Sequence, residues 1–552
     1  MAYEPPIFDQ YTALDFKSVL GGDGHGPRSN LAPTWIGKEN QRRLRAYTVL
    51  QAYLTNSSRH LLDRRASGSD ARREYGDADN IVSTFVSAVL GDEQEIHVEG
   101  AEDYEEDSPS SEATAAFELQ EKLREWATDE RLPLKMIEAE TKAVGLGDGV
   151  YALGWDTKKK RPRLRVRDPG FYFPVLDDND DDFPRRVHIA WELDEDDNLR
   201  TVRRITYELR TVEPYSVPWS DEPVTEECFM SDGVWKFGEL TRSVDDFKES
   251  AGEYTEDEEG LVRNRPLGID FIPVVHVPNT PSTEAHFGTS VLSLVLQILD
   301  DLQEADTDKA KASAVVATPF LGIAGARIDQ NEGLVFGPGS YIEMAENGKL
   351  FPVDLSAGLE RIATHIEELQ KRLSVNVKLP DAARGRVDSS EIESGIHLLL
   401  LYSPMQNIVR AMRLVRDEKM PLLLKFVQRF YMLANELQAP ERKAKIIFGS
   451  FMPNDEAASV ELVVKLLQTK AISLETAVRM LIEAGLPIED AAEEVRMIQE
   501  RDFVGAADLL AATGNEQDVA DYLGREVSTV RPPAPPIDLD LPDDEELPED
   551  SA

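Results

Sequence analysis

The hydrophobic period of this chain changes twice, and this change constrains the fold more than any other feature of the sequence. Apolar residues recur at helical spacing between residues 38 and 146, alternate with polar residues between 150 and 279, and return to helical spacing from Phe287 onward. The first region predicts two pairs of helices, and the second predicts a β-rich layer of about a hundred residues or more. We therefore expect an α+β fold.

The β-rich layer consists of short apolar runs separated by Lys-rich, Asp-rich or Gly-containing turns, a pattern typical of antiparallel hairpins. A helix stop precedes this layer, because Gly145, Gly147 and Gly149 interrupt the helical pattern. The predicted strands are residues 150–156, 163–168, 187–196, 199–212, 227–240 and 272–279.

Two amphipathic helices follow the β layer, and a compact segment with strand and turn patterns lies between them. The first helix is expected to start at Phe287, and the second covers residues 357–373. A further helical pattern, from about residue 390 to 436, would be roughly 70 Å long at 1.5 Å per residue. We expect this helix to be kinked at Pro404 and Pro421, because each proline removes a backbone donor and crowds the preceding turn.

A small basic segment, SVNVKLPDAARGRVDSSE, lies between the last two helical patterns. It carries Lys378, Arg384 and Arg386 against Asp381, Asp388 and Glu391, in a chain whose formal net charge is −43. Pro380 and Gly385 break any helix there and are candidate hinges. A strongly negative surface argues against a general coat for nucleic acid, but a local group of cations can still contact phosphate.

Composition bounds the class of protein. With 552 residues, 41% of them apolar, the chain can bury several cores. The single Cys228 cannot form an intrachain disulfide, and the N-terminal MAYEPPIFDQ lacks the basic and apolar regions of a signal peptide. The most apolar run, IHLLLLYSPM, is too short to span a bilayer. We expect a soluble protein that is made inside the cell.

The sequence contains none of the common catalytic or metal-binding motifs. It has no GxxxxGK[ST] phosphate loop, HExxH, paired CxxC or GxSxG, and its eight histidines have no metal-ligand spacing. GLGDGVYALG follows a helix and enters a strand, which reverses the order of a dinucleotide-binding fingerprint. We therefore expect no enzymatic activity, no metal and no cofactor.

Several charged groups have both a functional and a structural interpretation. Asp300 and Asp301 could act as acid and base or bind Mg²⁺, but their helical spacing beside an apolar stripe favours a solvated face. His276 and His286 flank a Pro-containing turn, which favours a structural role. The alternating arginines of residues 161–167 could contact phosphate, but ion pairs between domains or subunits are favoured in a chain with so many carboxylates.

Four segments carry a resemblance to a known family through their order and spacing. They are IPVVHVPNTP, FGTSVLSLVLQILDDLQEADTDKAKASAVVATPFLGIAG, FGPGSYIEMAENGKLFPVDLS and MPNDEAASVELVVKLLQTKAISLETAVRMLIEAG. With them the chain resembles the portal proteins of tailed bacteriophages over about residues 40 to 500. None of the four is a catalytic signature.

The resemblance implies a portal-like fold with a wing, a two-helix stem, a clip, a tunnel loop and a crown. An N-terminal extension and a Pro-rich, acidic C-terminal tail match nothing in the family. The implied segments are the extension 1–37, the wing 38–285 with helices followed by an antiparallel β layer, the first stem helix 286–314, the clip 315–355, the second stem helix 356–374, the tunnel loop 375–390, the long kinked wing helix 391–439, the crown 440–505 and the tail 506–552.

The resemblance also implies a function that belongs to an assembly. Portal proteins form a homo-oligomeric ring of about twelve subunits at one capsid vertex, since a head-to-tail interface that closes makes a ring. The ring conducts double-stranded DNA during packaging and ejection and retains it between them. The terminase packaging motor and then the head-to-tail adaptor dock on the ring, and the major capsid and scaffolding proteins are further partners. The resemblance thus implies a virion protein made in the host cytoplasm, with no membrane partner.

Within this resemblance, the basic segment corresponds to the tunnel loop. Lys378, Arg384 and Arg386 of each subunit would face the DNA, and Pro380 and Gly385 would let the loop follow the duplex. The alternative is that the three cations only cap neighbouring acidic helices. For the whole chain, the alternatives are a monomeric scaffold or adaptor protein and an enzyme of unfamiliar type.

Overall fold

In the computed structural model the chain divides into two compact units, Met1–Met452 and Pro453–Ala552. The predicted extension 1–37 and the predicted tail 506–552 lie outside the described residues. The structure describes residues 38–58, 73–104, 110–177, 180–193, 201–236, 253–254, 256–257, 260–280, 286–317, 321–324, 349–352, 356–384 and 395–451, and shorter stretches between 460 and 498.

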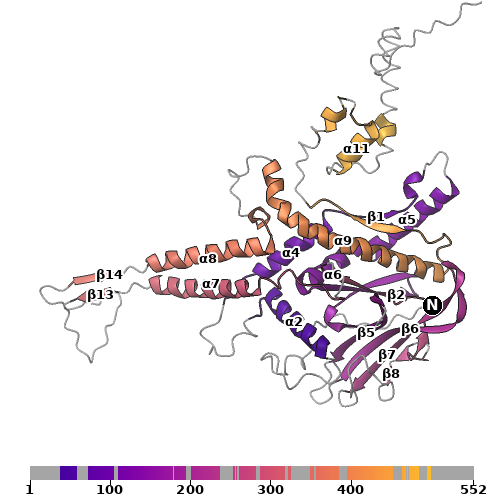
Figure 1. Ribbon diagram of the computed structural model, residues 1–552, viewed down its shortest axis with the longest axis horizontal. Coiled ribbons are helices and arrows are strands. Elements are labelled where there is room, and N and C mark those ends of the chain that lie inside the picture. The colour runs from indigo at the N-terminus through magenta and orange to yellow at the C-terminus, as the bar shows by residue number, and fades with distance from the viewer. Residues whose placement is uncertain are drawn as a thin grey trace, which may run out of the picture. The chain divides into compact units, whose positions relative to one another are not determined.

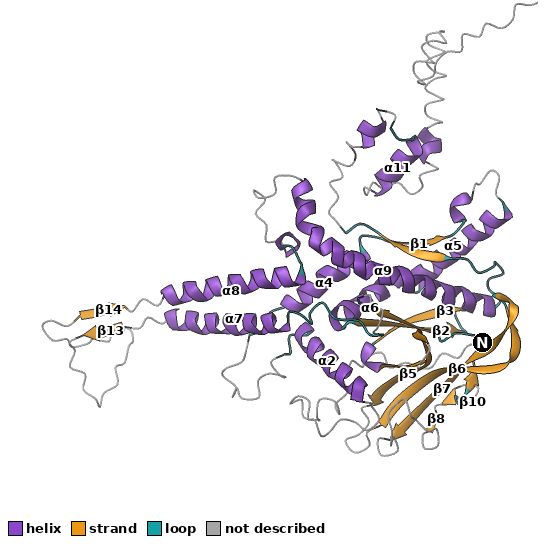
Figure 2. Ribbon diagram, viewed as in Figure 1, coloured by secondary structure: helices purple, strands orange, loops and turns teal. Residues whose placement is uncertain are grey.

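Among the described residues, four helices form the N-terminal part of the first unit, as the helical spacing predicts (Figures 1 and 2). Ser110 begins the third helix, because its hydroxyl accepts a 3.1 Å hydrogen bond from Ala113 N. The fourth helix ends at Gly147, whose φ of +116° favours glycine. The helices are α2 (Lys38–Leu54), α4 (Asp77–Leu90), α5 (Ser111–Asp129) and α6 (Leu132–Leu146), with the 3-10 helix η2 (Ala101–Asp103) between α4 and α5.

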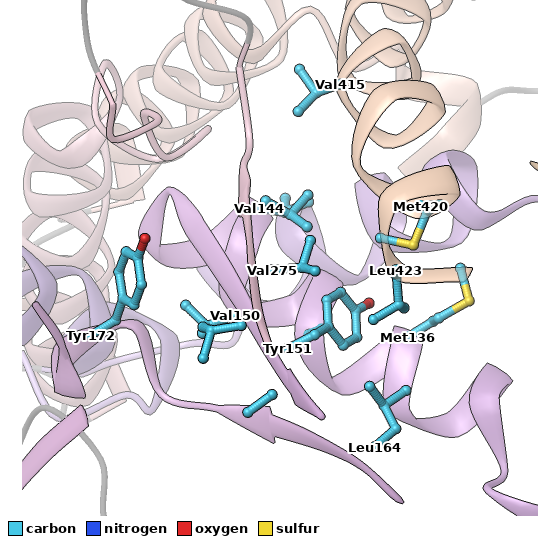
Figure 3. Packing of buried hydrophobic residues seen from close by; sticks show 14 of the residues in the cluster. Met136, Val144, Val150, Tyr151, Leu164, Tyr172, Val275, Val415, Met420 and Leu423 are labelled. Carbon is cyan, nitrogen blue, oxygen red and sulfur yellow. The ribbon is translucent and has the colours of Figure 1, made fainter. Parts of the chain in front are cut away.

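The main core lies where α6 and the long helix α9 (Gly395–Leu433) pack against a three-stranded antiparallel sheet (Figure 3). The side chains of Met136 on α6, Tyr151 on the central strand and Leu423 on α9 are fully buried there. The sheet has the order β12-β2-β3, formed by β2 (Asp148–Asp156), β3 (Arg161–Arg167) and β12 (Val274–Pro278).

A second antiparallel sheet has the order β11-β7-β6-β5-β4, with β8 also paired to β7. Its longest hairpin, formed by β6 and β7, pairs Thr201 with Lys236 at the open end. Within this hairpin the buried Arg203 donates hydrogen bonds of 3.1 and 2.7 Å to the carboxylate of Asp232, which compensates both buried charges. The remaining bounds are η3 (Pro169–Phe171), β4 (Tyr172–Asp177), β5 (Asp180–Leu193), β6 (Thr201–Val217), β7 (Ser220–Lys236), β8 (Glu253–Tyr254), β9 (Glu256–Asp257), β10 (Gly260–Leu261) and β11 (Arg265–Pro266), with β9 paired to β10.

Helices α7 (Leu296–Ala317) and α8 (Ser356–Val377) lie side by side (Figure 1). They are antiparallel, because the short paired strands β13 (Leu321–Ala324) and β14 (Lys349–Pro352) follow α7 and precede α8. The two amphipathic helices are thus present as predicted, with strands between them. The other residues of the predicted clip, beyond the end of α7, lie outside the described part of the chain. The pair is packed through buried apolar residues that include Leu299, Leu302, Ile366, Leu369 and Leu373.

The first helix of this pair begins later than the helical spacing predicts. Residues 286–295 form bends and turns, and α7 starts only after them. Gly288 N donates a 2.8 Å hydrogen bond to Asp148 Oδ1, and Ser290 Oγ donates a 2.7 Å hydrogen bond to Gly145 O. These contacts with the α6–β2 junction hold the segment in a non-helical conformation. Most of its apolar residues pack in or against the core without being part of a helix.

The long helix α9 has 39 residues and ends at Leu433, three residues before the predicted end at 436. Both Pro404 and Pro421 lie inside it, as expected. The α9 ribbon bends in its N-terminal part (Figure 1), and the helix is continuous through both prolines. Residues 385–394, which precede α9, are outside the described ranges.

The last described strand of the first unit belongs to a two-stranded sheet. β1 (Gln94–Val98), which the periodicity does not predict, pairs antiparallel with β15 (Ala444–Phe448). Such a ribbon is marginal by itself, and α5 supports it, because Gln120 Oε1 accepts a 3.0 Å hydrogen bond from Val98 N. β15 belongs to the first unit, although residues 440–505 were assigned to the crown. In the second unit the longest described helix is α11 (Leu474–Glu483).

Candidate functional site

The site predicted from the sequence begins at the C-terminal end of α8, which closes with a left-handed residue. Lys378 has a φ of +57°, and its N–H donates a 3.2 Å hydrogen bond to Val375 O. The next N–H, of Leu379, donates a 3.0 Å hydrogen bond to Ser374 O. These two bonds form the Schellman arrangement, in which the left-handed position is usually glycine. Residues 375–377, assigned to the loop from the sequence, are therefore helical.

The Lys378 side chain is exposed at this turn. Its neighbours Val377 and Leu379 are both buried, so the turn is fixed to the protein body on either side of the exposed cation. Pro380 follows, three residues after the end of α8, and accepts a 3.0 Å hydrogen bond from Ala383 N. This bond lies in the 3-10 helix η6 (Asp381–Arg384), which the sequence did not predict.

Arg384 turns back toward α8 and α4. Its Nη1 donates a 3.0 Å hydrogen bond to Ser374 Oγ, and its Nη2 lies 3.5 Å from Oδ1 of Asp77, the first residue of α4. Ser374 Oγ in turn donates a 3.0 Å hydrogen bond to Asp381 Oδ1. The Arg384 side chain is only 4% exposed. Arg384 thus ties η6 to both helices, and its guanidinium is not presented to solvent in this conformation.

A further carboxylate lies close to Asp77. Burial raises the pKa of Asp306 on α7, the negative charge of Asp77 raises it further, and Lys309 partly opposes these effects. Arg384 is the cation that lies within 3.5 Å of Asp77. The N-terminus of α4, the α7–α8 pair and the start of the basic segment therefore meet in one coupled group of charges.

The two described cations of the predicted site have opposite surroundings. Lys378 is exposed, and Arg384 is paired and buried. Arg386 and Gly385 lie outside the described residues, so the predicted DNA contact of Arg386 and the predicted hinge at Gly385 stay predictions.

Comparisons with known proteins do not assign a family. No family model and no curated protein matches this chain. Within the described ranges, no group of three or more His, Cys, Asp or Glu side chains is arranged to hold a metal ion. None of the helices in those ranges combines the length and the apolar character that crossing a membrane requires.

The two histidines flanking the Pro-containing turn form part of a stacked aromatic group. The rings of His276 and His286 have centroids 4.5 Å apart, and both stack on Tyr172. His276 Nε2 lies 2.7 Å from Asp148 Oδ1, and Tyr47 OH donates a hydrogen bond to the other oxygen of Asp148. Asp148 therefore links α2, β2 and β12 in the interior, which agrees with the structural interpretation of His276.

Two other ambiguous groups have partners within the chain. Arg161 forms ion pairs with Asp129 and Glu130 at the end of α5, within the first unit and not between domains or subunits as expected. Asp300 accepts a 2.6 Å hydrogen bond from Tyr53 OH on α2. Part of the acidic side of α7 is therefore a packing contact and not only the solvated face expected.

Sequence reasoning missed the ion pairs that join distant segments. Arg384 and Asp77 are 307 residues apart in sequence, and Arg416 and Glu140 are 276 apart. The Arg416 guanidinium is fully buried on α9 and donates a 2.6 Å hydrogen bond to Glu140 Oε2 on α6. Periodicity reports which face of a helix is apolar, so it carries no signal for the partner of a single buried charge.

Proposed function

We propose that this chain is a subunit of a ring-shaped portal that conducts double-stranded DNA through one capsid vertex. The observation that carries the proposal is the α7–α8 pair, which has the β13–β14 strands at one end and the Lys378 turn at the other. Together with the 39-residue α9 that follows, this is the order of stem, clip, tunnel loop and long helix implied by the sequence resemblance. Long amphipathic helices in a chain without a common catalytic motif suit a subunit that works in an assembly.

In this proposal the basic segment has two parts with different roles. Lys378 and Arg386 approach the phosphates of the duplex, where each neutralised phosphate adds a salt-dependent attraction that does not depend on base sequence. Arg384 is a positioning residue, because its contacts with Ser374 and Asp77 fix the start of the loop. The predominantly acidic chain repels DNA elsewhere, so the loop grips the duplex without general adhesion.

The region around β13 and β14 is the docking platform in this proposal. It binds the terminase motor during packaging and the head-to-tail adaptor afterwards. The portal itself hydrolyses no nucleotide, since the sequence has no phosphate loop and the motor supplies the ATPase.

The proposal is tested by replacing the loop cations in assembled heads. Lys378→Gln combined with Arg386→Gln is expected to leave ring formation unchanged but to reduce the DNA retained in filled heads, most strongly at low salt. Lys445→Gln, at an exposed position on β15, is the matched control and should retain DNA as the wild type does. Normal packaging and retention in the double variant, with intact rings, would refute the DNA contact.

A further inference from the structure

The two most exposed large hydrophobic side chains of the described residues lie in the turn before α7 and in the last turn of α8. Leu294, in the turn before α7, is 83% exposed, and Val375, in the last turn of α8, is 75% exposed. Because the helices are antiparallel, the start of α7 and the end of α8 lie at the same end of the pair. Large apolar side chains with this degree of exposure are candidates for contact with another protein surface.

Exposed charged residues lie on both helices, and their sign differs between the helices. Asp301 and Glu304 follow Leu294 on the exposed side of α7, while Lys371 and Arg372 precede Val375 on the exposed side of α8. We call Leu294, Asp301 and Glu304 the α7 face, and Lys371, Arg372 and Val375 the α8 face. Among the described residues, none of the four charged side chains has a hydrogen bond or an ion pair.

The charged side chains lean in compatible directions. Side chains on an α-helix tilt toward its N-terminus, so Asp301 leans toward the end of the pair that holds Leu294 and Val375. Arg372 leans away from that end, because α8 runs in the opposite direction. When an α7 face meets an α8 face in antiparallel orientation, the apolar residues meet and the opposite charges point toward each other.

We propose that the α7 face of one copy binds the α8 face of a second copy of this chain. The charges favour a second copy of this chain as the partner. Each chain carries both an acidic α7 face and a basic α8 face, and both faces lie outside the buried apolar contact between its own α7 and α8. Phosphate is excluded from the acidic α7 face by repulsion. The contact is heterologous, so its repetition builds a ring or an open filament. This inference rests on the proposed function, for which it specifies the contact between neighbouring subunits.

The test uses two charge-reversed full-length chains. Variant A carries Asp301→Lys and Glu304→Lys, and variant B carries Lys371→Glu and Arg372→Glu. In a sample of either variant alone, like charges face each other across the contact. We therefore expect the protein concentration needed for half-maximal assembly to rise roughly tenfold or more. An equimolar mixture should assemble again, because every A–B contact then pairs opposite charges. The defect of each single variant should shrink in about 1 M salt, where charges are screened.

The outcomes separate this inference from the function. Rings that form normally from A alone and from B alone overturn the inference and leave the portal proposal standing. Loss of assembly in A and B without recovery in the mixture also overturns it, with circular dichroism confirming that both variants are folded. Open filaments that show the predicted recovery support the contact but contradict the portal. A wild-type chain that stays monomeric at all concentrations contradicts both.

Discussion

Arg384 Nη1 donates a 3.0 Å hydrogen bond to Ser374 Oγ, and this bond joins the first turn after α8 to the helix itself. The same guanidinium reaches Asp77 on α4. Half of the segment that looked like a free basic loop in the sequence is therefore held against two helices. The contacts of Arg384 with Ser374 and Asp77 thus hold the chain that follows the exposed turn at Lys378.

Replacing Arg384 should destabilise the protein. Arg384→Gln removes hydrogen bonds made by a buried charged group and leaves Asp77 facing Asp306 without its cation, so we expect the free energy of unfolding to fall by about 1 to 3 kcal/mol. Asp306→Asn in the same chain should restore part of this loss, because it removes the repulsion. The measurement is chemical denaturation of the two single variants and the double variant. Strict additivity of the two changes would show that the groups are not coupled.

Asp306 should make stability depend on pH. Its pKa is raised in the folded protein by burial and by Asp77, so the folded state favours the protonated carboxyl. The contribution of Asp306 to stability is therefore most favourable below the ordinary Asp pKa of about 4 and is lost as the pH rises through the higher folded value. Asp306→Asn should raise the melting temperature at neutral pH and have little effect at pH 4. Asp308→Asn, at an exposed position on the same helix, is the control. A larger effect of Asp306→Asn in acid than at neutral pH would contradict this assignment.

Two substitutions of Lys378 distinguish the effect of its charge from the effect of its left-handed backbone conformation. Lys378→Gly relieves the left-handed conformation and is expected to raise stability by up to about 1 kcal/mol, whereas Lys378→Gln keeps the strain. Both substitutions remove the charge, so both should lower DNA retention equally if Lys378 touches phosphate. Thermal unfolding and retention assays on the same pair of variants check this. A DNA defect in only one variant would mean that loop conformation, and not charge, controls retention.

Replacing only one partner of the buried pair of Arg416 and Glu140 should strongly lower the free energy of unfolding. Glu140→Gln leaves a fully buried guanidinium without its countercharge, and we expect a loss of about 3 kcal/mol or more. Arg416→Met combined with Glu140→Leu removes both charges and should recover most of this loss. Urea denaturation of the single and double variants measures the difference. Equal destabilisation in both would assign the effect to packing between α6 and α9.

Local signals predicted much of the fold. The helical spacing found α4, α5, α6 and α8, and the alternating pattern found the strands on both sides of the β6–β7 turn. The start of α7 was misplaced because Gly288 and Ser290 form hydrogen bonds with the distant α6–β2 junction, and such contacts override local periodicity. The end of α8 was placed too early because a lysine fills a position where glycine is the usual signal.

The candidate site was predictable only in part. The cluster of Lys378, Arg384 and Arg386 was visible as three cations within residues 378–386, where Asp381 is the single carboxylate. Its division into an exposed lysine and a buried, paired arginine depends on Asp77, which belongs to a helix in a distant part of the sequence. A charge pattern shows where cations occur, but the partner of each cation is set by tertiary structure.

The central claim is that the chain works as a ring, and particle mass tests it most directly. Native mass spectrometry or light scattering on the purified protein should give a closed particle of about twelve subunits, each of 61.7 kDa, over a wide concentration range. Electron microscopy of the same sample should show a central channel. A particle with the mass of one chain, unchanged at high concentration, would contradict the portal and favour a monomeric scaffold or adaptor.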